Sequence, residues 1–183
     1  MELIGTVVRL QVQRSRLKPG PKPHRVYDPA PLLEVDELVV TPRGVTGPGG
    51  LLDVHHADHA DTRNVKLTNG LSVMTTQRYD ALREAYGPQL LDGIAGESLL
   101  LDAGDDLTGE LLLESEEGHL DLVGEPTPPC VEFSRFVLGR GVGDTGPEVL
   151  ATMAALGDGA RGFYLRTTGT GRVRAGHRLL RRS

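Results

Sequence analysis

Cys130 is the only cysteine of the 183-residue chain, and its sulfur has the clearest capacity for chemistry. It follows Pro128 and Pro129, whose rings fix their own φ and disfavour helix in the residue before each, so we expect a stiff, extended lead-in. A thiolate is a good nucleophile and a soft metal ligand, and nearby cations favour it. Arg135 is the nearest such cation along the chain. The alternative is that Cys130 is a small buried hydrophobic residue.

A second stretch, residues 53 to 61, contains three histidines and three aspartates. It partly resembles the His-x-His-x-Asp-His motif of metallo-β-lactamase-fold hydrolases, because His56, Asp58 and His59 match while Val54 occupies the first histidine position. A zinc site requires such ligands to converge in space. A zinc-dependent hydrolase is therefore one hypothesis for this stretch, and a polar loop is the other.

Composition limits the architecture. A chain of this length can form one domain with a real core, and we expect a single domain spanning residues 1–183. The 24 glycines, 12 prolines, absent tryptophan and 4% aromatic content favour many short strands and turns. A lone cysteine excludes an internal disulfide framework. We find no signal peptide and no apolar stretch of membrane-spanning length, so we expect a cytoplasmic protein with no membrane partner.

The net charge of −5 argues against nucleic acid as a partner. The charges are nevertheless uneven, because basic residues gather near the start and at the end of the sequence. These residues are Arg14, Arg16, Lys18, Lys22, His24 and Arg25, and then Arg172, Arg174, Arg178, Arg181 and Arg182. If the two termini meet, as chain ends often do, one basic patch suited to a small anionic ligand could form. The alternative is two solvated basic segments that stay apart.

Short strands dominate the predicted secondary structure. Alternation and β-branched content predict strands over residues 3–12, 32–41, 64–67, 71–74, 97–101, 111–114, 119–123 and 163–168. Residues 17–31 contain five prolines and one glycine, so they predict a long basic loop. So many strands suggest a closed sheet.

Helices are predicted at two places. Residues 76–86 carry apolar side chains at helical spacing, with Thr75 or Thr76 as the cap and Gly87 as the stop. A second helix is expected from about Pro147 to Leu156. Before it, residues 137–146 suggest a strand followed by a glycine-rich loop, an arrangement that can hold a phosphate at a helix N-terminus. Because no acidic residue ends the next strand, a dinucleotide-binding fold is rejected.

The chain from about residue 93 to residue 180 resembles the MOSC domain family, named after the C-terminal domain of molybdenum cofactor sulfurases. Residues 161–164 and 169–177 resemble the closing signature of that family, and residues 93–99 resemble its Gly-Glu-Asn-Leu segment. Pro129 and Cys130 match its Pro-Cys pair. The chain departs from the pattern at Ser98, which replaces Asn, and at His177, which replaces Asp. The usual Gly-Asp-Arg-His loop is reduced to Asp53 and one of the two following histidines.

This resemblance implies a mainly β fold, a compact MOSC-type β-barrel of short strands with a few short helices. It also implies binding of molybdenum cofactor (molybdopterin), with Cys130 as the catalytic residue, either carrying sulfur as a persulfide or ligating molybdenum. A phosphorylated pterin would be positioned by charge-assisted hydrogen bonds. The cofactor-binding residues we expect are Arg14, Lys18, Lys22, Arg25, Glu97, Ser98, Arg135 and Arg161.

Three functions follow as hypotheses. The first is a cofactor-binding sulfur carrier, or a molybdoenzyme that reduces N-hydroxylated compounds, with a sulfur donor or an electron-transfer protein as partner. The second is a non-catalytic module that holds the cofactor, with Cys130 merely packed. The third is the zinc hydrolase that uses His56, Asp58 and His59.

Overall fold

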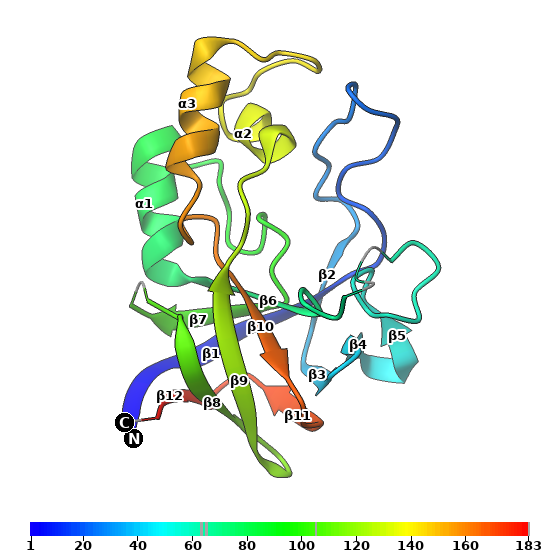
Figure 1. The fold of residues 1–183 in the computed structure, drawn as a ribbon, viewed down its shortest axis with the longest axis vertical. Coiled ribbons are helices and arrows are strands. Elements are labelled where there is room, and N and C mark those ends of the chain that lie inside the picture. Colours follow the sequence, from blue (N-terminus) through cyan, green and yellow to red (C-terminus); the bar gives the residue numbers. More distant parts are fainter. Residues whose placement is uncertain (63, 65, 105, 183) are drawn as a thin grey trace.

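A closed seven-stranded β-barrel forms the body of the molecule (Figure 1). The computed structural model describes residues 1–62, 64, 66–104 and 106–182. Strand β12 pairs with β1 and thereby closes the sheet in the order β12, β8, β9, β10, β6, β7 and β1. The barrel strands are β1 (Glu2–Gln13), β6 (Leu71–Thr75), β7 (Leu99–Ala103), β8 (Gly109–Ser115), β9 (Gly118–Pro126), β10 (Phe163–Thr167) and β12 (Arg178–Arg181).

Five further strands and a short 3-10 turn lie outside the closed ring of the barrel. Strand β2 (Leu32–Val35) pairs with the end of β1, where Leu10 lies opposite Val35. A second sheet has the order β11, β3, β4 and β5. Its strands are β11 (Gly171–Arg174), β3 (Glu37–Thr41), β4 (Gly44–Gly47) and β5 (Leu51–Leu52), with a short 3-10 turn, η1 (Pro48–Gly50), before β5.

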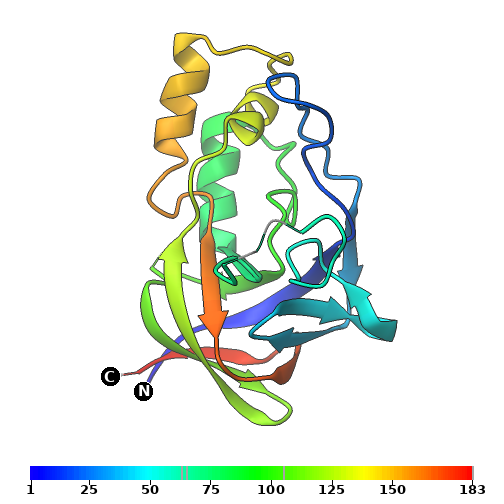
Figure 2. The same ribbon diagram turned by 45° about the vertical axis from the view of Figure 1, so that its right-hand side comes forward.

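Three helices cover one end of the barrel, at the top of Figures 1 and 2. They are α1 (Thr76–Tyr86), α2 (Val131–Val137) and α3 (Pro147–Ala155). The side-chain oxygen of Thr75 accepts a hydrogen bond from the Arg78 N–H and caps α1, and Gly87 ends it at a φ of 112°. Among the described residues, no helix has the length and apolar character needed to cross a membrane.

Two apolar clusters stabilise this arrangement. Inward-facing side chains of the barrel strands, among them Val7, Leu101 and Leu179, fill the barrel. A second cluster lies between the barrel end and the helices and includes Met74 and Phe133. The cavities described below lie in this region between the barrel end and the helices, where loops and helices meet the open end of the barrel.

The predicted β-barrel with a few short helices is confirmed. The strands expected at 3–12, 71–74, 97–101, 111–114, 119–123 and 163–168 are all present, with ends shifted by a few residues. The helices at 76–86 and 147–156 are present, and residues 17–31 form an irregular loop. Strands β4, β5, β11 and β12 were not predicted.

Three expectations about local structure were wrong. Residues 32–41 form two strands, because the chain leaves the barrel sheet at Asp36 and continues in the second sheet. Val137 ends helix α2 instead of forming a strand before the glycine-rich loop. The segment 64–67 is no strand at Asn64, Lys66 and Leu67, and residue 65 lies outside the described residues.

The two ends of the chain do meet, since Glu2 pairs with Arg181 across β1 and β12 (Figure 1). The expected joint basic patch does not form, because the first basic segment follows the far end of β1. The C-terminal arginines instead pair with acidic residues: Arg174 with Glu37 and Glu116, Arg178 with Glu114, Arg181 with Asp106, and Arg182 with Asp121.

Candidate functional site

Cys130 lies at the N-terminal end of α2, in the extended conformation expected from the prolines before it, with φ −135° and ψ 115°. Its thiol donates a hydrogen bond to Glu132 Oε2 at 3.3 Å. On its other side the sulfur accepts one from Lys18 Nζ at 3.5 Å, although 112 residues separate the two in sequence. Only 6% of Cys130 is exposed. The thiol is therefore held between a cation and a carboxylate.

Cys130 lines a cavity of about 480 Å³. Residues of the basic loop 17–31 line one side of the cavity, and residues of α2 and its proline lead-in line the other. The loop and the helix both lie at the top of the molecule in Figures 1 and 2. Met153 of α3 and Tyr164 of β10 complete the lining. Five of the cations predicted from the sequence share this cavity with the sulfur: Lys18, Lys22, Arg25, Arg135 and Arg161.

Three of these cations donate hydrogen bonds to backbone carbonyl oxygens, and the first is Arg25, whose Nε donates to the carbonyl oxygen of Gly20 at 3.2 Å. Arg135 is only 5% exposed, and its Nε donates to the carbonyl oxygen of Asp144 at 2.6 Å. Arg161 Nη1 donates to the carbonyl oxygen of Pro128 at 3.3 Å, while its buried Nε has no hydrogen-bond partner. The Arg161 guanidinium also lies 5.4 Å from the centre of the Phe133 ring.

Within the described part of the chain, none of the five cavity cations forms an ion pair with a carboxylate within 4.0 Å. Arginines elsewhere on the surface do, as Arg43 pairs with Asp58 and Arg174 with Glu37. A buried cation without a counter-charge is costly. The cavity therefore presents an excess of positive charge beside the sulfur and suits an anionic ligand.

Glu132 is the carboxylate that lines this cavity. Burial on its own raises the pKa of Glu132. Hydrogen bonds from its own backbone N–H and from the Cys130 thiol, together with Lys18 and Arg25, outweigh burial, so the pKa lies below its ordinary value. Glu132 is consequently ionised at neutral pH and offsets part of the positive charge.

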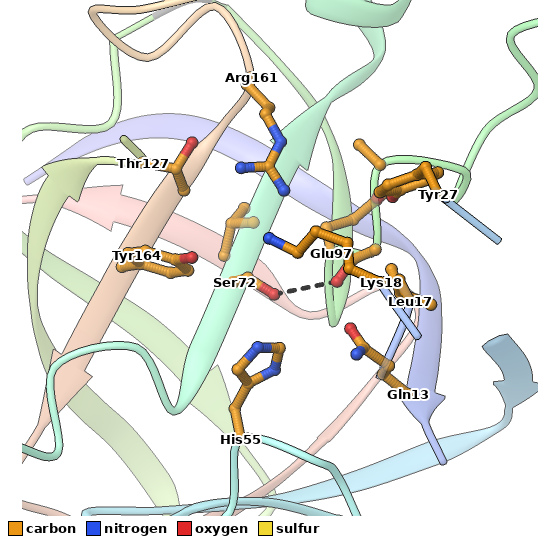
Figure 3. Close-up of a pocket in the computed structure, with 13 residues that line it drawn as sticks. Gln13, Leu17, Lys18, Tyr27, His55, Ser72, Glu97, Thr127, Arg161 and Tyr164 are labelled. Atoms are coloured by element: carbon orange, nitrogen blue, oxygen red, sulfur yellow. Dashed lines mark hydrogen bonds between the residues drawn. The ribbon is translucent and has the colours of Figure 1, made fainter. Parts of the chain in front are cut away.

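The cavity continues into two smaller hollows, of about 70 and 170 Å³, which share Lys18 and Tyr164 with it. Figure 3 shows the side chains of Lys18, Arg161 and Tyr164 around one space, with His55 on its opposite side. The ring of His55 is oriented by Asp53, whose Oδ1 lies 3.1 Å from His55 Nδ1. Asp53 is in turn fixed by the Gln13 N–H at 2.7 Å.

Three of the predicted cofactor-binding residues lie outside the large cavity. Arg14 is exposed and its Nε donates to the carbonyl oxygen of Pro31 at 3.4 Å. Ser98 is buried against Ser72 Oγ, which accepts a hydrogen bond from the Ser98 N–H at 3.1 Å. Their roles in binding, like those of the cavity residues, stay predictions.

Glu97, the third of these, lines the 70 Å³ hollow. It is almost fully buried, with Oε2 accepting a hydrogen bond from the Tyr79 hydroxyl at 2.9 Å and Oε1 without a partner. Burial raises the pKa of Glu97 to about 7, against smaller opposing effects of its hydrogen bonds and of Arg9. A carboxyl group with this pKa holds a proton at mildly acidic pH.

The proposed zinc ligands do not converge. His56 Nδ1 accepts a hydrogen bond from the Asp58 N–H, Asp58 pairs with Arg43, and His59 Nδ1 accepts one from the Asp61 N–H. Among the described residues, no group of three or more His, Cys, Asp or Glu side chains is placed to hold a metal ion. The stretch forms a polar loop, which was the alternative expectation.

Sequence reasoning did not identify Tyr164, Met153 or Gln13 as residues of these cavities. Tyr164 alternates along β10 between Phe163 and Leu165, so its sequence pattern indicates only a strand. The signal for His55 was present in the Asp-rich and His-rich stretch. Asp53 orients His55 toward the two smaller hollows, and Asp53 is itself held by the backbone of β1, which is distant in sequence. Residue spacing alone could not predict this orientation.

Two solved structures share this fold. The YuaD protein from Bacillus subtilis matches with a TM-score of 0.63 and 14% identity, covering 97% of this chain and 94% of that one. YiiM from Escherichia coli matches with a TM-score of 0.54 and 14% identity, covering 100% of this chain and 71% of that one. No family model matches the chain, and no curated protein matches it in sequence. These likenesses are consistent with a MOSC-like fold.

Proposed function

We propose that the chain binds a molybdopterin-type cofactor in the cavity beside Cys130. The observation that carries this proposal is the set of five cations that line the cavity and form no ion pair within 4.0 Å with a carboxylate of the described residues. Such cations fit a phosphorylated ligand, because charged hydrogen bonds from Arg and Lys are among the strongest that a protein offers to phosphate. Arg25 and Lys22 would hold the phosphate from the loop, and Arg135 and Arg161 from the opposite wall.

Cys130 would carry the chemistry. When bound, the cofactor supplies a molybdenum centre that exchanges electrons or a sulfur ligand. Lys18 Nζ lies 3.5 Å from the Cys130 sulfur, and the sulfur lines the cavity behind its proline lead-in. As a sulfur carrier, Cys130 attacks the terminal sulfur of a persulfide R–S–SH from a donor protein. The donor S–S bond breaks, R–SH leaves with the proton, and Cys130 becomes the persulfide.

As an alternative within the same proposal, the Cys130 thiolate would ligate molybdenum directly, and an electron-transfer protein would supply electrons for reduction of an N-hydroxylated compound. Both routes require one protein sulfur in an anion-binding cavity. They differ in whether an added sulfur is found on Cys130.

The test is expression of the chain in cells that make the cofactor, followed by elemental analysis for molybdenum and phosphorus and by intact mass measurement. We expect stoichiometric molybdenum and phosphorus, both reduced in the double variant Lys22→Ala, Arg25→Ala. The matched control is Arg166→Ala, Arg172→Ala, which removes the same charge from exposed positions outside the cavity. Retention in the cavity variant equal to that in the control would refute the cavity as the binding site.

A second candidate, a non-catalytic module that holds the cofactor, is favoured by one observation. Cys130 is 6% exposed and packs in the same apolar cluster as Leu17 and Phe133. Unchanged molybdenum retention in Cys130→Ser, together with no added sulfur mass on the wild type, would support this module. Loss of molybdenum, or an added mass of one sulfur on the wild type only, would support the catalytic role.

A further inference from the structure

A second cavity of about 290 Å³ lies along helix α2, beside the cavity that contains the sulfur. Three residues line both cavities: Arg25, Glu132 and Arg135. The two spaces therefore adjoin along these side chains. A ligand whose phosphate lies between Arg25 and Arg135 can extend into the second cavity without leaving the protein surface.

The second cavity differs from the first in being largely apolar. Its walls include the rings of Tyr27 and Phe136, whose centroids lie 5.0 Å apart. Val26 and Val142 also line it and are 50% and 47% exposed. Exposed aliphatic and aromatic side chains beside charged side chains are typical of a ligand site that takes a flat apolar body.

The wall opposite the basic loop comes from the segment after α2, residues 139–142. This segment reaches across the top of the molecule toward the loop of residues 17–31 (Figure 2). The two approach closely, since a Cβ on Gly143 would lie 3.9 Å from His24 Nδ1. The cavity is thus a slot between two loops, with Phe136 of α2 at its base.

We propose that this slot binds a planar heteroaromatic ring joined to the phosphate that the cationic cavity holds, as in a purine nucleotide. Arg25 and Arg135 bind the phosphate, and the ring lies between Val26 and Val142 against Phe136. The Glu132 carboxylate offers an acceptor to ring N–H donors, such as those of guanine. This inference rests on the proposed function, because it uses the same phosphate-binding cations.

Two sources share this chemistry: the pterin of the proposed cofactor and the base of a separate nucleotide. Guanosine monophosphate presents both the phosphate and the ring and serves as the probe. Inorganic phosphate tests the cations alone, and guanosine tests the slot alone. All three are measured on the cofactor-free chain by isothermal titration calorimetry.

We expect guanosine monophosphate to bind at least about tenfold more tightly than inorganic phosphate. Val142→Asp places a carboxylate in the slot beside Arg25 and Arg135, so we expect it to weaken phosphate binding as well and to remove the gain of guanosine monophosphate over phosphate. Leu150→Asp is the matched control, because Leu150 is 50% exposed on α3 and lines neither cavity. It should leave all three affinities unchanged.

The outcomes separate the two proposals. Equal affinity for phosphate and guanosine monophosphate would overturn the slot while leaving the anion site intact. Binding of neither would overturn the anion site as well. A gain that survives Val142→Asp would also overturn the slot. Repeating the titration on cofactor-loaded protein assigns the source: retained nucleotide binding indicates a separate nucleotide, and lost binding indicates that the cofactor's own ring fills the slot.

Discussion

At the scale of single residues, the site is defined by cations that form no ion pair with a carboxylate among the residues the structure describes. Arg135 is nearly as buried as the core leucines, yet it forms no ion pair in the described part of the chain. Replacing such a cation with an apolar residue usually costs little stability or adds some. Its position next to Cys130 is therefore better explained by binding of an external anion than by folding.

The excess positive charge should be measurable through the chemistry of the sole thiol. Iodoacetate is an anion and iodoacetamide is neutral, and both alkylate Cys130. We expect the ratio of the iodoacetate rate constant to the iodoacetamide rate constant to be about three- to tenfold higher in the folded chain than in the urea-unfolded chain. The ratio cancels the thiolate fraction, so it reports the net field of the cavity cations and Glu132 at the sulfur. Stopped alkylation followed by mass spectrometry measures it.

Two controls define this experiment. The ratio should fall toward the unfolded value in 1 M NaCl, because salt screens exposed charges. It should fall in Arg25→Ala and stay unchanged in Arg172→Ala, where the lost charge is paired with Glu37 outside the cavity. A folded-state ratio equal to the unfolded one would contradict the charge assignment.

Glu97 gives a prediction about pH. Burial raises its pKa to about 7 in the folded chain from the ordinary 4.5, so the native state binds the proton more tightly than the unfolded state does. The tighter proton binding stabilises the folded state fully below pH 4.5, and this stabilisation is lost as the pH rises through 7. The unfolding free energy should fall by an amount on the order of 3 kcal/mol over this range. Glu97→Gln should remove this loss.

The measurement is urea unfolding of both proteins at pH 5 and pH 8. Glu97→Gln keeps an acceptor for the Tyr79 hydroxyl, so we expect it to be the more stable protein at pH 8 and about equal at pH 5. Glu84→Gln, on the exposed face of α1, controls for the removal of one charge. An identical pH dependence in Glu97→Gln and wild type would show that Glu97 ionises normally.

At the scale of elements, strand β9 depends on a glycine. A Cβ at Gly124 would lie 1.9 Å from the carbonyl oxygen of Leu107, a backbone atom that cannot move aside cheaply. We expect Gly124→Ala to destabilise the fold by roughly 2 kcal/mol or more. Gly104→Ala, where the nearest atom is 3.8 Å away, should change stability by less than about 1 kcal/mol. Chemical denaturation checks both, and equal effects would contradict the crowding argument.

Local signals in the sequence predicted elements well where chain geometry alone decides them. The prolines before Cys130 fixed its extended approach, and Thr75 and Gly87 fixed both ends of α1. Val137 was assigned to a strand because a short apolar run has no period that separates strand from helix. The sequence around Asp36 did not predict that the chain passes from one sheet to the other there. The change of sheet depends on the positions of β1, which pairs with β2, and of β11, which pairs with β3.

The candidate site was predictable in its residue types and not in its shape. The basic loop and the Pro-Cys segment were identified from composition, and five of the expected cations share a cavity with the sulfur. The contact of Lys18 with Cys130 spans 112 residues and arises only once β1 is fixed in the barrel. The slot against Phe136 requires two loops to approach, which no local pattern encodes.

At the scale of the whole molecule, closure of the barrel supports the site. Strand β1 pairs with β12, β7 and β2 along its length, and the basic loop leaves from its end at Gln13. Leu179 on β12 is 1% exposed and lies at the seam between β1 and β8. Because β12 joins the two edges of the sheet, a defect there affects both neighbours.

We therefore expect Leu179→Ala to cost about 2 to 5 kcal/mol of unfolding free energy through the lost contacts and the cavity left behind. Amide hydrogen exchange should rise along β1 and β8 together, because both lose the strand that seals them. Leu33→Ala, on the edge strand β2 with 40% exposure, should cost less than about 1 kcal/mol and leave β8 protected. If exchange rose in β12 alone, the barrel would not unfold as one cooperative unit. Closure by β12 would then not explain how β1 positions Lys18 beside Cys130.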